Sequence, residues 1–165
     1  MSRRTSPSSL ASRLSRVCGR RYIHQNCIKR IENLEECTEL ATLQISNNWL
    51  NCIENLSGLT RLSTLNVAHN NLETADDLRH LLACPNISVL DLQHNKLHDA
   101  GILDVLEAMP QLAVLQLQGN PVVPKISNYR RNVIARCKTL TYLDDRSAPH
   151  LDPAPPSAVP PLSLL

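Results

Sequence analysis

The feature that most constrains this chain is a short aliphatic pattern that recurs along its length. Four segments fit the template LxxLxLxxNxL, in which L is any aliphatic residue, and they begin at Leu40, Leu62, Ile87 and Leu112. A weaker copy at residues 23–28 precedes them. The template asparagines follow one another at intervals of 22, 22, 25 and 25 residues: Asn26, Asn48, Asn70, Asn95 and Asn120. Such a period predicts small units stacked on one another rather than a globule around one centre.

Each part of the template has a physical reading. Successive side chains of a strand point to opposite faces, so the L-x-L part predicts a short strand with its leucines turned inward. The strands of successive repeats then stack in parallel, about 4.8 Å apart. The asparagine lies where the chain bends away from the sheet, and its amide can pair backbone groups that the bend leaves unsatisfied. We therefore predict a structural role for the asparagine ladder.

The length of each repeat limits what its convex side can hold. The 22-residue repeats leave room for a short helical turn, with four aliphatic side chains facing inward: Ile31, Leu34, Ile53 and Leu56. The 25-residue repeats have room for a helix each. Thr74 to Asp77 resembles a capping box before the inward-facing residues Leu78, Leu81 and Leu82. Asp99 is expected to cap the second helix, which Pro110 ends.

These elements predict an α/β solenoid with a parallel concave sheet and short helices on the convex side. The pattern changes after Asn120, where Ser127 begins an expected helix that runs to Cys137. A last, partial repeat follows at residues 140–143. Because a solenoid must cover its final apolar layer, we assign residues 121–146 to a cap within a repeat domain that spans 22–148.

The two ends of the chain differ from the repeats in composition. Residues 1–21 hold six arginines and no acid, which leaves 11 basic against 15 acidic residues, a net charge of −4, in the rest. We expect a disordered basic extension there, although the composition also resembles a mitochondrial transit peptide. Residues 149–165 are rich in proline and predict a disordered tail or a short polyproline ligand. No apolar stretch approaches the ~20 residues that cross a bilayer.

Residues that alternate with the buried leucines predict the surface that meets a partner. They form three columns across the repeats: Gln44, Asn66, Asp91 and Gln116; Ser46, Ala68, Gln93 and Gln118; and Asn47, His69, His94 and Gly119. The columns are polar, small and mostly neutral, which suits hydrogen bonding to a protein; phosphate binding would need clustered Lys or Arg. We predict that their polar members bind a protein partner, that the chain is a monomer, and that neither nucleic acid nor membrane is bound.

Two histidines and one acid in these columns raise the question of chemistry. His69 and His94 are neighbours, and Asp91 stands one strand position away. A metal or acid–base site would need further ligands or a nucleophile. We therefore interpret these residues as a solvated or partner-facing group, and we expect no catalytic residue, metal or cofactor.

Two other features are candidates for the binding surface. Trp49 follows Asn48 and lies outside the leucine columns. It is either an interface hot spot or an edge residue that shields Leu50 or Ile28. A basic patch lies on the capping helix and predicts a solvated face or a dock for an acidic protein surface: Lys125, Arg130, Arg131, Arg136 and Lys138.

The repeat template is that of the leucine-rich-repeat family. The chain resembles its cilium-related members through the IxxIENL motif at residues 28–34, the IENL at 53–56, and the segments 109–112, 120–131 and 140–146. That resemblance implies a cytoplasmic, cilium-associated role in the preassembly of axonemal dynein arms and in ciliary architecture, with dynein chains or assembly chaperones as partners. Six cysteines without a CxxC pair agree with reduced thiols in a cytosolic chain.

The sequence therefore predicts a non-catalytic scaffold that binds a protein. The alternative is a regulatory subunit that binds a protein phosphatase through the concave face. Such a face should carry a dense acidic and aromatic patch, whereas Asp91 is the only acid among the columns named above. We therefore favour the dynein-assembly hypothesis.

Overall fold

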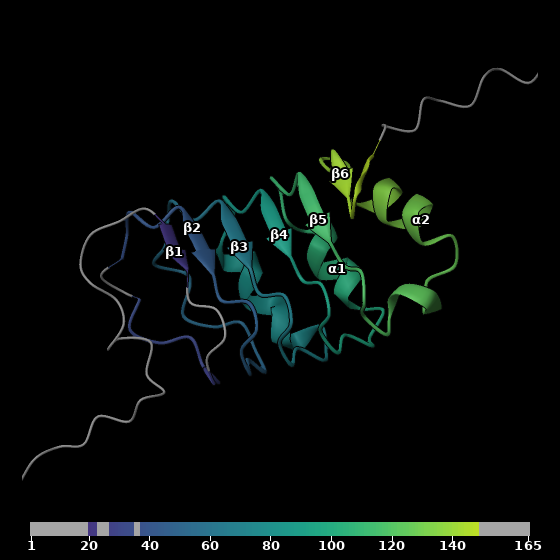
Figure 1. Ribbon diagram of the computed structural model, residues 1–165. Coiled ribbons are helices and arrows are strands. Elements are labelled where there is room, and N and C mark those ends of the chain that lie inside the picture. The colour runs from purple at the N-terminus through teal and green to yellow at the C-terminus, as the bar shows by residue number, and fades with distance from the viewer. Residues whose placement is uncertain (1–19, 23–26, 35–36, 149–165) are drawn as a thin grey trace, which may run out of the picture.

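The computed structural model describes residues 20–22, 27–34 and 37–148, in which one sheet runs along the length of the solenoid (Figure 1). Its strands lie side by side in the order of the sequence. The sheet contains β1 (Arg20–Tyr22), β2 (Thr42–Gln44), β3 (Thr64–Asn66), β4 (Val89–Asp91), β5 (Val114–Gln116), β6 (Tyr142–Leu143) and β7 (Arg146–Ser147). Strands β1 to β6 are parallel, and β7 turns back antiparallel to β6.

The register of the sheet is the one that the template predicts. Leu43 pairs with Leu65, Leu65 with Leu90, and Leu90 with Leu115 across adjacent strands. All four side chains are fully buried. One leucine per layer therefore builds the core directly beneath the sheet, and the predicted solenoid with a parallel sheet is confirmed.

The first strand lies at the margin of the described residues. β1 begins at Arg20, ahead of the domain boundary that we expected at residue 22. Arg21 stands in register with Leu43, at the position where the other repeats carry a leucine. Asn26 and the segments 1–19 and 149–165 lie outside the described residues, so the expectations for the basic head, the first asparagine and the tail stay predictions.

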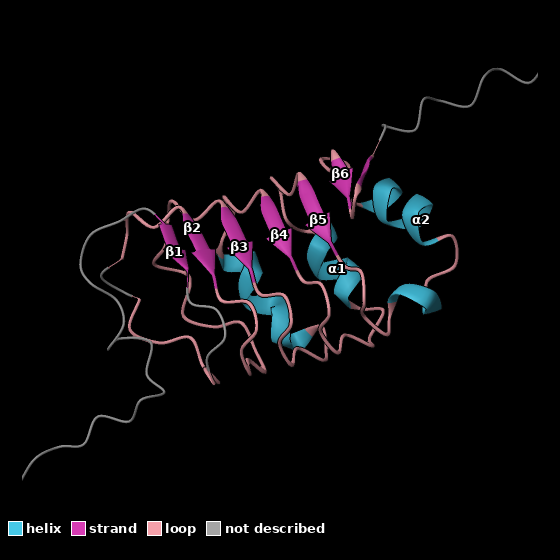
Figure 2. Cartoon of the chain, in the orientation of Figure 1, coloured by secondary structure: helices cyan, strands magenta, loops and turns pink. Residues whose placement is uncertain are grey.

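Helices cover the side of the solenoid opposite the sheet, and in the residues that the structure describes they begin after β3 (Figure 2). They are the 3-10 helices η2 (Asp76–Ala83) and η3 (Val123–Lys125) and the α-helices α1 (Ile102–Glu107) and α2 (Tyr129–Arg136). In the described part of the 22-residue repeats, the convex side consists of bends and short turns, such as the one closed by the Leu59 N–H on the Leu56 carbonyl at 2.9 Å, and no residue there is helical. Its inward side chains are nevertheless buried: Ile31, Leu34, Ile53 and Leu56.

Two details of η2 differ from the prediction. Leu78 and Leu81 are buried, but Leu82, which we also expected inside, is 49% exposed. The helix is of the 3-10 type, with three residues per turn, so residues three apart share a face and the next residue rotates away. Only half of the predicted capping box forms. Asp77 accepts hydrogen bonds from the backbone N–H groups of Glu73 and Thr74 at 2.9 and 2.8 Å, and the Thr74 side chain does not cap the helix.

The α-helices lie close to their expected places. Asp99 accepts the backbone N–H of Gly101 at 2.9 Å in the turn before α1. The residue that directly precedes the helix is Gly101, and no side chain caps it, so the expected Asp99 cap is wrong by two residues. α2 begins two residues after Ser127, behind Asn128, which has a left-handed backbone with φ 49°. Cys137 follows α2 and is buried, where a free cysteine packs as a small hydrophobe. In the described part of the chain, no helix is both long and apolar enough to span a bilayer.

The C-terminal cap is fastened by one arginine and one aspartate. Arg130 donates to the carbonyl oxygens of Leu143 at 2.8 Å and Ser147 at 3.1 Å, and so ties α2 to the strands β6 and β7. Asp144 accepts the backbone N–H of Leu117 at 2.9 Å and closes the end of β5. Burial and the Asp144 carboxylate raise the pKa of the Tyr129 hydroxyl, which therefore stays protonated.

Candidate functional site

The first predicted column runs across the exposed side of the sheet. Gln44, Asn66, Asp91 and Gln116 stand in register on four adjacent strands, and each side chain is half-buried. Asn66 and Asp91 use a side-chain oxygen to accept the backbone N–H of the residue two positions on, at 3.0 Å in both cases. These bonds hold the side chains against the end of each strand while leaving polar atoms on the face.

The second column adds hydrogen-bonding groups beside the first. The Gln93 side-chain amide donates to the Gln116 side-chain oxygen at 2.5 Å, and Gln118 donates to Asp145 at 3.2 Å. Ala68, in contrast, is only 5% exposed and offers little contact area. Ser46 is half-buried at the N-terminal end of this column. The polar surface of the second column is therefore concentrated over β4 and β5.

The third column lies at the bend that follows each strand. Asn47, His69, His94 and Gly119 all have a positive φ, of 56°, 54°, 50° and 76°. The rings of His69 and His94 are exposed and stack with their centroids 4.5 Å apart and their planes 13° from parallel. The His94 ring in turn lies over Gly119, where a Cβ atom would collide with it. A glycine at this position therefore leaves space for the histidine stack.

Asp91 is the acidic group of the concave columns. Burial raises its pKa, while the Gln93 backbone N–H and the two histidines act in the opposite direction. No salt bridge to Asp91 occurs among the residues that the structure describes. A partly desolvated carboxylate without an ion pair is suited to receiving a hydrogen-bond donor or a cation from a bound partner.

A further row of the same face was missed by our sequence analysis. Residues two positions before the first column share its face, because side chains alternate along a strand. In register they are Thr42, Thr64, Val89, Val114 and Tyr142. Tyr142 is 52% exposed. The last three form an apolar strip beside the polar columns over β4, β5 and β6, and the period of two could have identified them.

The asparagine ladder lies beneath this face, inside the solenoid. The Asn70 side chain accepts the backbone N–H of Leu50 at 3.0 Å and donates to the carbonyls of Ile45, Val67 and Ala68 at 3.0 to 3.2 Å. It thereby joins two consecutive repeats. Three other ladder residues are buried and make the same kind of bonds to the backbone: Asn48, Asn95 and Asn120. Their role is to satisfy the backbone at each bend rather than to contact a ligand.

Trp49 lies after the bend that follows β2, at one edge of the solenoid. Its side chain is 52% exposed, and the Lys29 ammonium lies 5.9 Å from the ring centroid. The neighbouring Leu50 and Ile28 are buried. Exposed aromatic area beside a cation is available to a partner, and the same position also covers the edge of the first layers. Both interpretations of Trp49 therefore stay open.

The basic patch of the cap separates into two kinds of residue. Arg130 binds backbone carbonyls, and Arg136 bridges Asp104 and Glu107 at 2.5 and 2.6 Å. Lys125, Arg131 and Lys138 are exposed. Within the described ranges, no group of three or more His, Cys, Asp or Glu side chains could hold a metal ion.

Comparison with known proteins places this geometry in context. Residues 19–151 match the family model described as leucine-rich repeat. Human dynein axonemal assembly factor 1 is 68% identical over 28 residues, which are 17% of this chain and 4% of that protein. A chain of the Drosophila melanogaster SNF/U2A' complex is similar with 28% identity and a TM-score of 0.68, over 78% of this chain and 73% of that one. Internalin C2 from Listeria monocytogenes is 25% identical, with a TM-score of 0.56, over 71% of this chain and 46% of its own.

Proposed function

Because this chain belongs to the leucine-rich-repeat family, we propose that its concave face holds a protein partner during the preassembly of axonemal dynein arms. The family is generally a non-enzymatic scaffold for protein interactions, and the chain is such a scaffold. The dynein-related role, the cytoplasmic and cilium-associated location, and dynein chains or their assembly chaperones as partners are the specific content of the proposal.

The observation that carries this proposal is the match to human dynein axonemal assembly factor 1, 68% identical over 28 residues. The matched stretch is 4% of that protein, so the chain shares a small part of the relative's length. What supports transfer of the role is the high identity within the stretch. The surrounding fold also provides a surface on which a scaffold can act.

The chemistry of the concave face supports a protein as the ligand. Amide side chains dominate the two columns on the strands, and the strip of Val89, Val114 and Tyr142 lies beside them. Protein interfaces combine such an apolar centre with a polar rim. A partner can bury Tyr142 against the valines while it hydrogen bonds to Gln116 and Asp91.

The alternative of a phosphatase regulatory subunit receives no better support. The first two columns contain one acidic residue, Asp91. Asp145, which accepts a hydrogen bond from Gln118, adds a second carboxylate beside them. This is sparse compared with the dense acidic and aromatic patch that the alternative requires. We therefore treat a phosphatase as an outcome of the test below.

The proposal is tested by expressing the tagged full chain in ciliated cells and quantifying the bound proteins by mass spectrometry. A double variant, Gln44→Arg with Tyr142→Arg, adds two charges to the concave face. We expect dynein chains or their assembly chaperones to be enriched with the native chain. Recovery should fall by about tenfold or more with this variant, because unpaired charges in an interface are costly.

A matched control carries the same two charges on exposed positions away from the concave face, Asn51→Arg with Ala135→Arg. This control should recover the partners as well as the native chain does. Recovery of a phosphatase catalytic subunit in place of dynein-related proteins would overturn the proposal. Equal recovery of dynein chains with the concave-face variant and the control variant would also overturn it.

A further inference from the structure

A groove of about 490 Å³ lies on the convex side, between η2 and α1. Its apolar part is formed by Ala75, Leu82 and Val105, of which Val105 is nearly buried at 7% exposure. The two helices that flank the groove pack against one another. The groove therefore faces away from the concave surface, and a ligand bound in it leaves the sheet free.

Leu82 is the apolar side chain that the groove presents to solvent. With Trp49 and Tyr142, it is one of three large hydrophobic side chains that are exposed in the described residues. Leu78 and Leu81 already fill the core beneath η2, so packing of the helix does not require Leu82. An exposed leucine at the mouth of a groove is available to bury against a partner's side chain.

The rim of the groove is acidic. Three carboxylates line it against one guanidinium: Asp76, Asp99 and Asp104 against Arg79. The Arg79–Asp76 ion pair, at 2.7 Å, is about three-quarters exposed on both sides, so solvent screens it strongly and an incoming cation can replace it.

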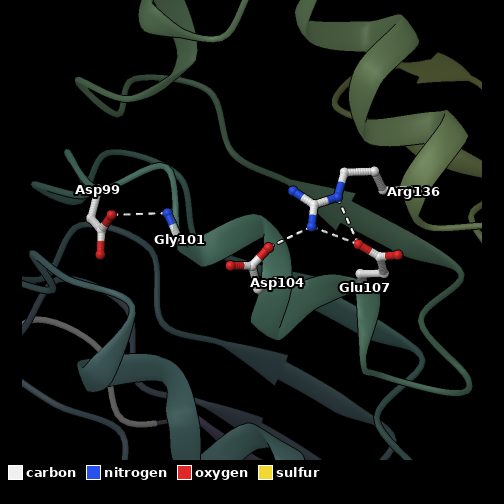
Figure 3. Close-up of polar contacts among 5 residues, drawn as sticks. All are labelled: Asp99, Gly101, Asp104, Glu107 and Arg136. Atoms are coloured by element: carbon white, nitrogen blue, oxygen red, sulfur yellow. Dashed lines mark hydrogen bonds and ion pairs between the residues drawn. The ribbon is translucent and has the colours of Figure 1, made fainter.

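The neighbouring arginine does not neutralise this rim. Figure 3 shows Arg136 of α2 reaching back to α1, where its guanidinium is shared between Asp104 and Glu107. Asp99 is oriented by the Gly101 backbone N–H, as the same view shows. One positive charge between two carboxylates leaves a negative excess at this end of the groove.

We propose that this groove docks a basic segment of a second protein, which inserts one aliphatic side chain beside Leu82 and Val105 and places Lys or Arg against the rim. Charge complementarity selects this occupant, because the groove combines an apolar floor with a surplus of carboxylates. The site is separate from the concave face, so this proposal stands or fails independently of the dynein-related role. It gives the scaffold two surfaces on which two proteins can be held at once.

The test uses the full chain and a short fluorescent peptide in which two central leucines are flanked by arginines. Fluorescence anisotropy gives the affinity, and NMR amide shifts of the labelled chain locate the site. We expect shifts in η2 and α1 and weaker binding at raised salt. Leu82→Ser should weaken binding roughly fivefold or more, as expected for the loss of one aliphatic contact. Asp76→Asn should weaken it to a smaller extent.

The matched control is Ala83→Ser, which changes the next, exposed residue of η2 outside the lining of the groove and should leave the affinity unchanged. Equal binding of a peptide with glutamates in place of the arginines would overturn the proposal. Shifts confined to the concave strands, or an affinity indifferent to Leu82→Ser, would also overturn it. So would peptide binding only after the arginines of residues 1–19 are replaced, since the chain's own head would then be the occupant.

Discussion

The two halves of the solenoid share one sheet but complete their convex side in different ways. The 22-residue repeats rely on individual polar contacts, such as the Arg30–Glu54 ion pair at 2.8 Å and the Asn55 amide that donates to the Ile31 carbonyl at 2.6 Å. The 25-residue repeats instead pack helix against helix, η2 on α1 and α1 on α2. We infer that the leucine template determines the strands of the sheet, whereas the length of a repeat determines whether its convex side holds a helix.

The halves meet at η2, which supports the repeat that precedes it. The backbone N–H of Ile53 donates to the Asp77 carbonyl at 2.8 Å, and that of Leu56 donates to His80 Nε2 at 2.9 Å. This helix on the convex side therefore satisfies two backbone groups of the preceding repeat, whose residues 48–69 form no helix. We expect the helical half to be the more rigid one and to hold the other in place.

The largest effect that separates the halves should come from truncating equivalent core leucines. Leu90 and Leu43 are both fully buried at the same position of the template. We expect Leu90→Ala to lower the free energy of unfolding by about 4 kcal/mol and Leu43→Ala by about 2 to 3 kcal/mol. The turns around Leu43 can move into the cavity more readily than packed helices can. Urea unfolding followed by circular dichroism measures both, and an equal or larger loss at Leu43 would refute the comparison.

The next largest effect should come from the cap that ends the helical half. Arg130→Ala removes the bonds from α2 to the Leu143 and Ser147 carbonyls, and we expect it to lower the free energy of unfolding by about 2 kcal/mol. Arg131→Ala changes the adjacent, exposed arginine and should cost less than about 0.5 kcal/mol. Thermal unfolding of the two variants distinguishes a structural arginine from a solvated one. Similar losses of stability in both variants would show that the positive charge of the helix, and not the bonds to the carbonyls, stabilises the cap.

A smaller effect is expected at the junction of the halves. His80→Ala leaves the Leu56 backbone N–H without its acceptor, and we expect a loss of about 1 to 2 kcal/mol. Hydrogen exchange of the amides in residues 50–59 should also accelerate, because the repeat before η2 loses its support. The exposed His98 provides the control, and His98→Ala should change neither quantity. Faster exchange restricted to η2 would contradict the proposed support.

The smallest effect concerns the acid that distinguishes the helical half of the concave face. Asp91 stands in the column where the other half has Gln44 and Asn66, and burial raises its pKa. The folded chain thus binds this proton more tightly than the unfolded chain does. Protonated Asp91 therefore stabilises the fold at low pH, and this stabilisation is lost as the pH rises through the raised pKa of Asp91.

Asp91→Asn removes that loss while it keeps an oxygen that can accept the Gln93 N–H. At neutral pH we expect the free energy of unfolding to rise by about 0.5 kcal/mol, and in strong acid we expect no difference between the two proteins. Urea unfolding across the acidic range measures this. Destabilisation at neutral pH would mean that the ionised carboxylate is needed by the fold.

Sequence reasoning succeeded where a residue's environment is local and repeated. The register of Leu43, Leu65, Leu90 and Leu115 follows from the template alone, because each layer repeats the one before. Sequence reasoning failed where the helix is of the 3-10 type and not the expected α-helix. The exposure of Leu82 depends on η2 being a 3-10 helix, a choice that the leucine spacing does not encode.

The candidate surface was predicted in part for the same reason. The polar columns could be named from the template, and the adjacent row that ends in Tyr142 needed only the same alternation. The convex groove could not be found this way, because its rim joins Asp76 and Asp104 from different repeats and depends on Leu82 turning outward. Contacts between residues far apart in the sequence are invisible to a pattern read within one repeat.

The short antiparallel strand β7 has a consequence for assembly. A parallel sheet that ended on a bare strand would offer a template on which a second solenoid could continue the stack, and repetition of that step would build a fibre. Here the outer neighbour of β6 is β7, two residues that run in the opposite direction and are held by Arg130. Because β7 reverses the direction, another copy finds no parallel strand to continue at this end, and we expect the cap to disfavour head-to-tail stacking of copies.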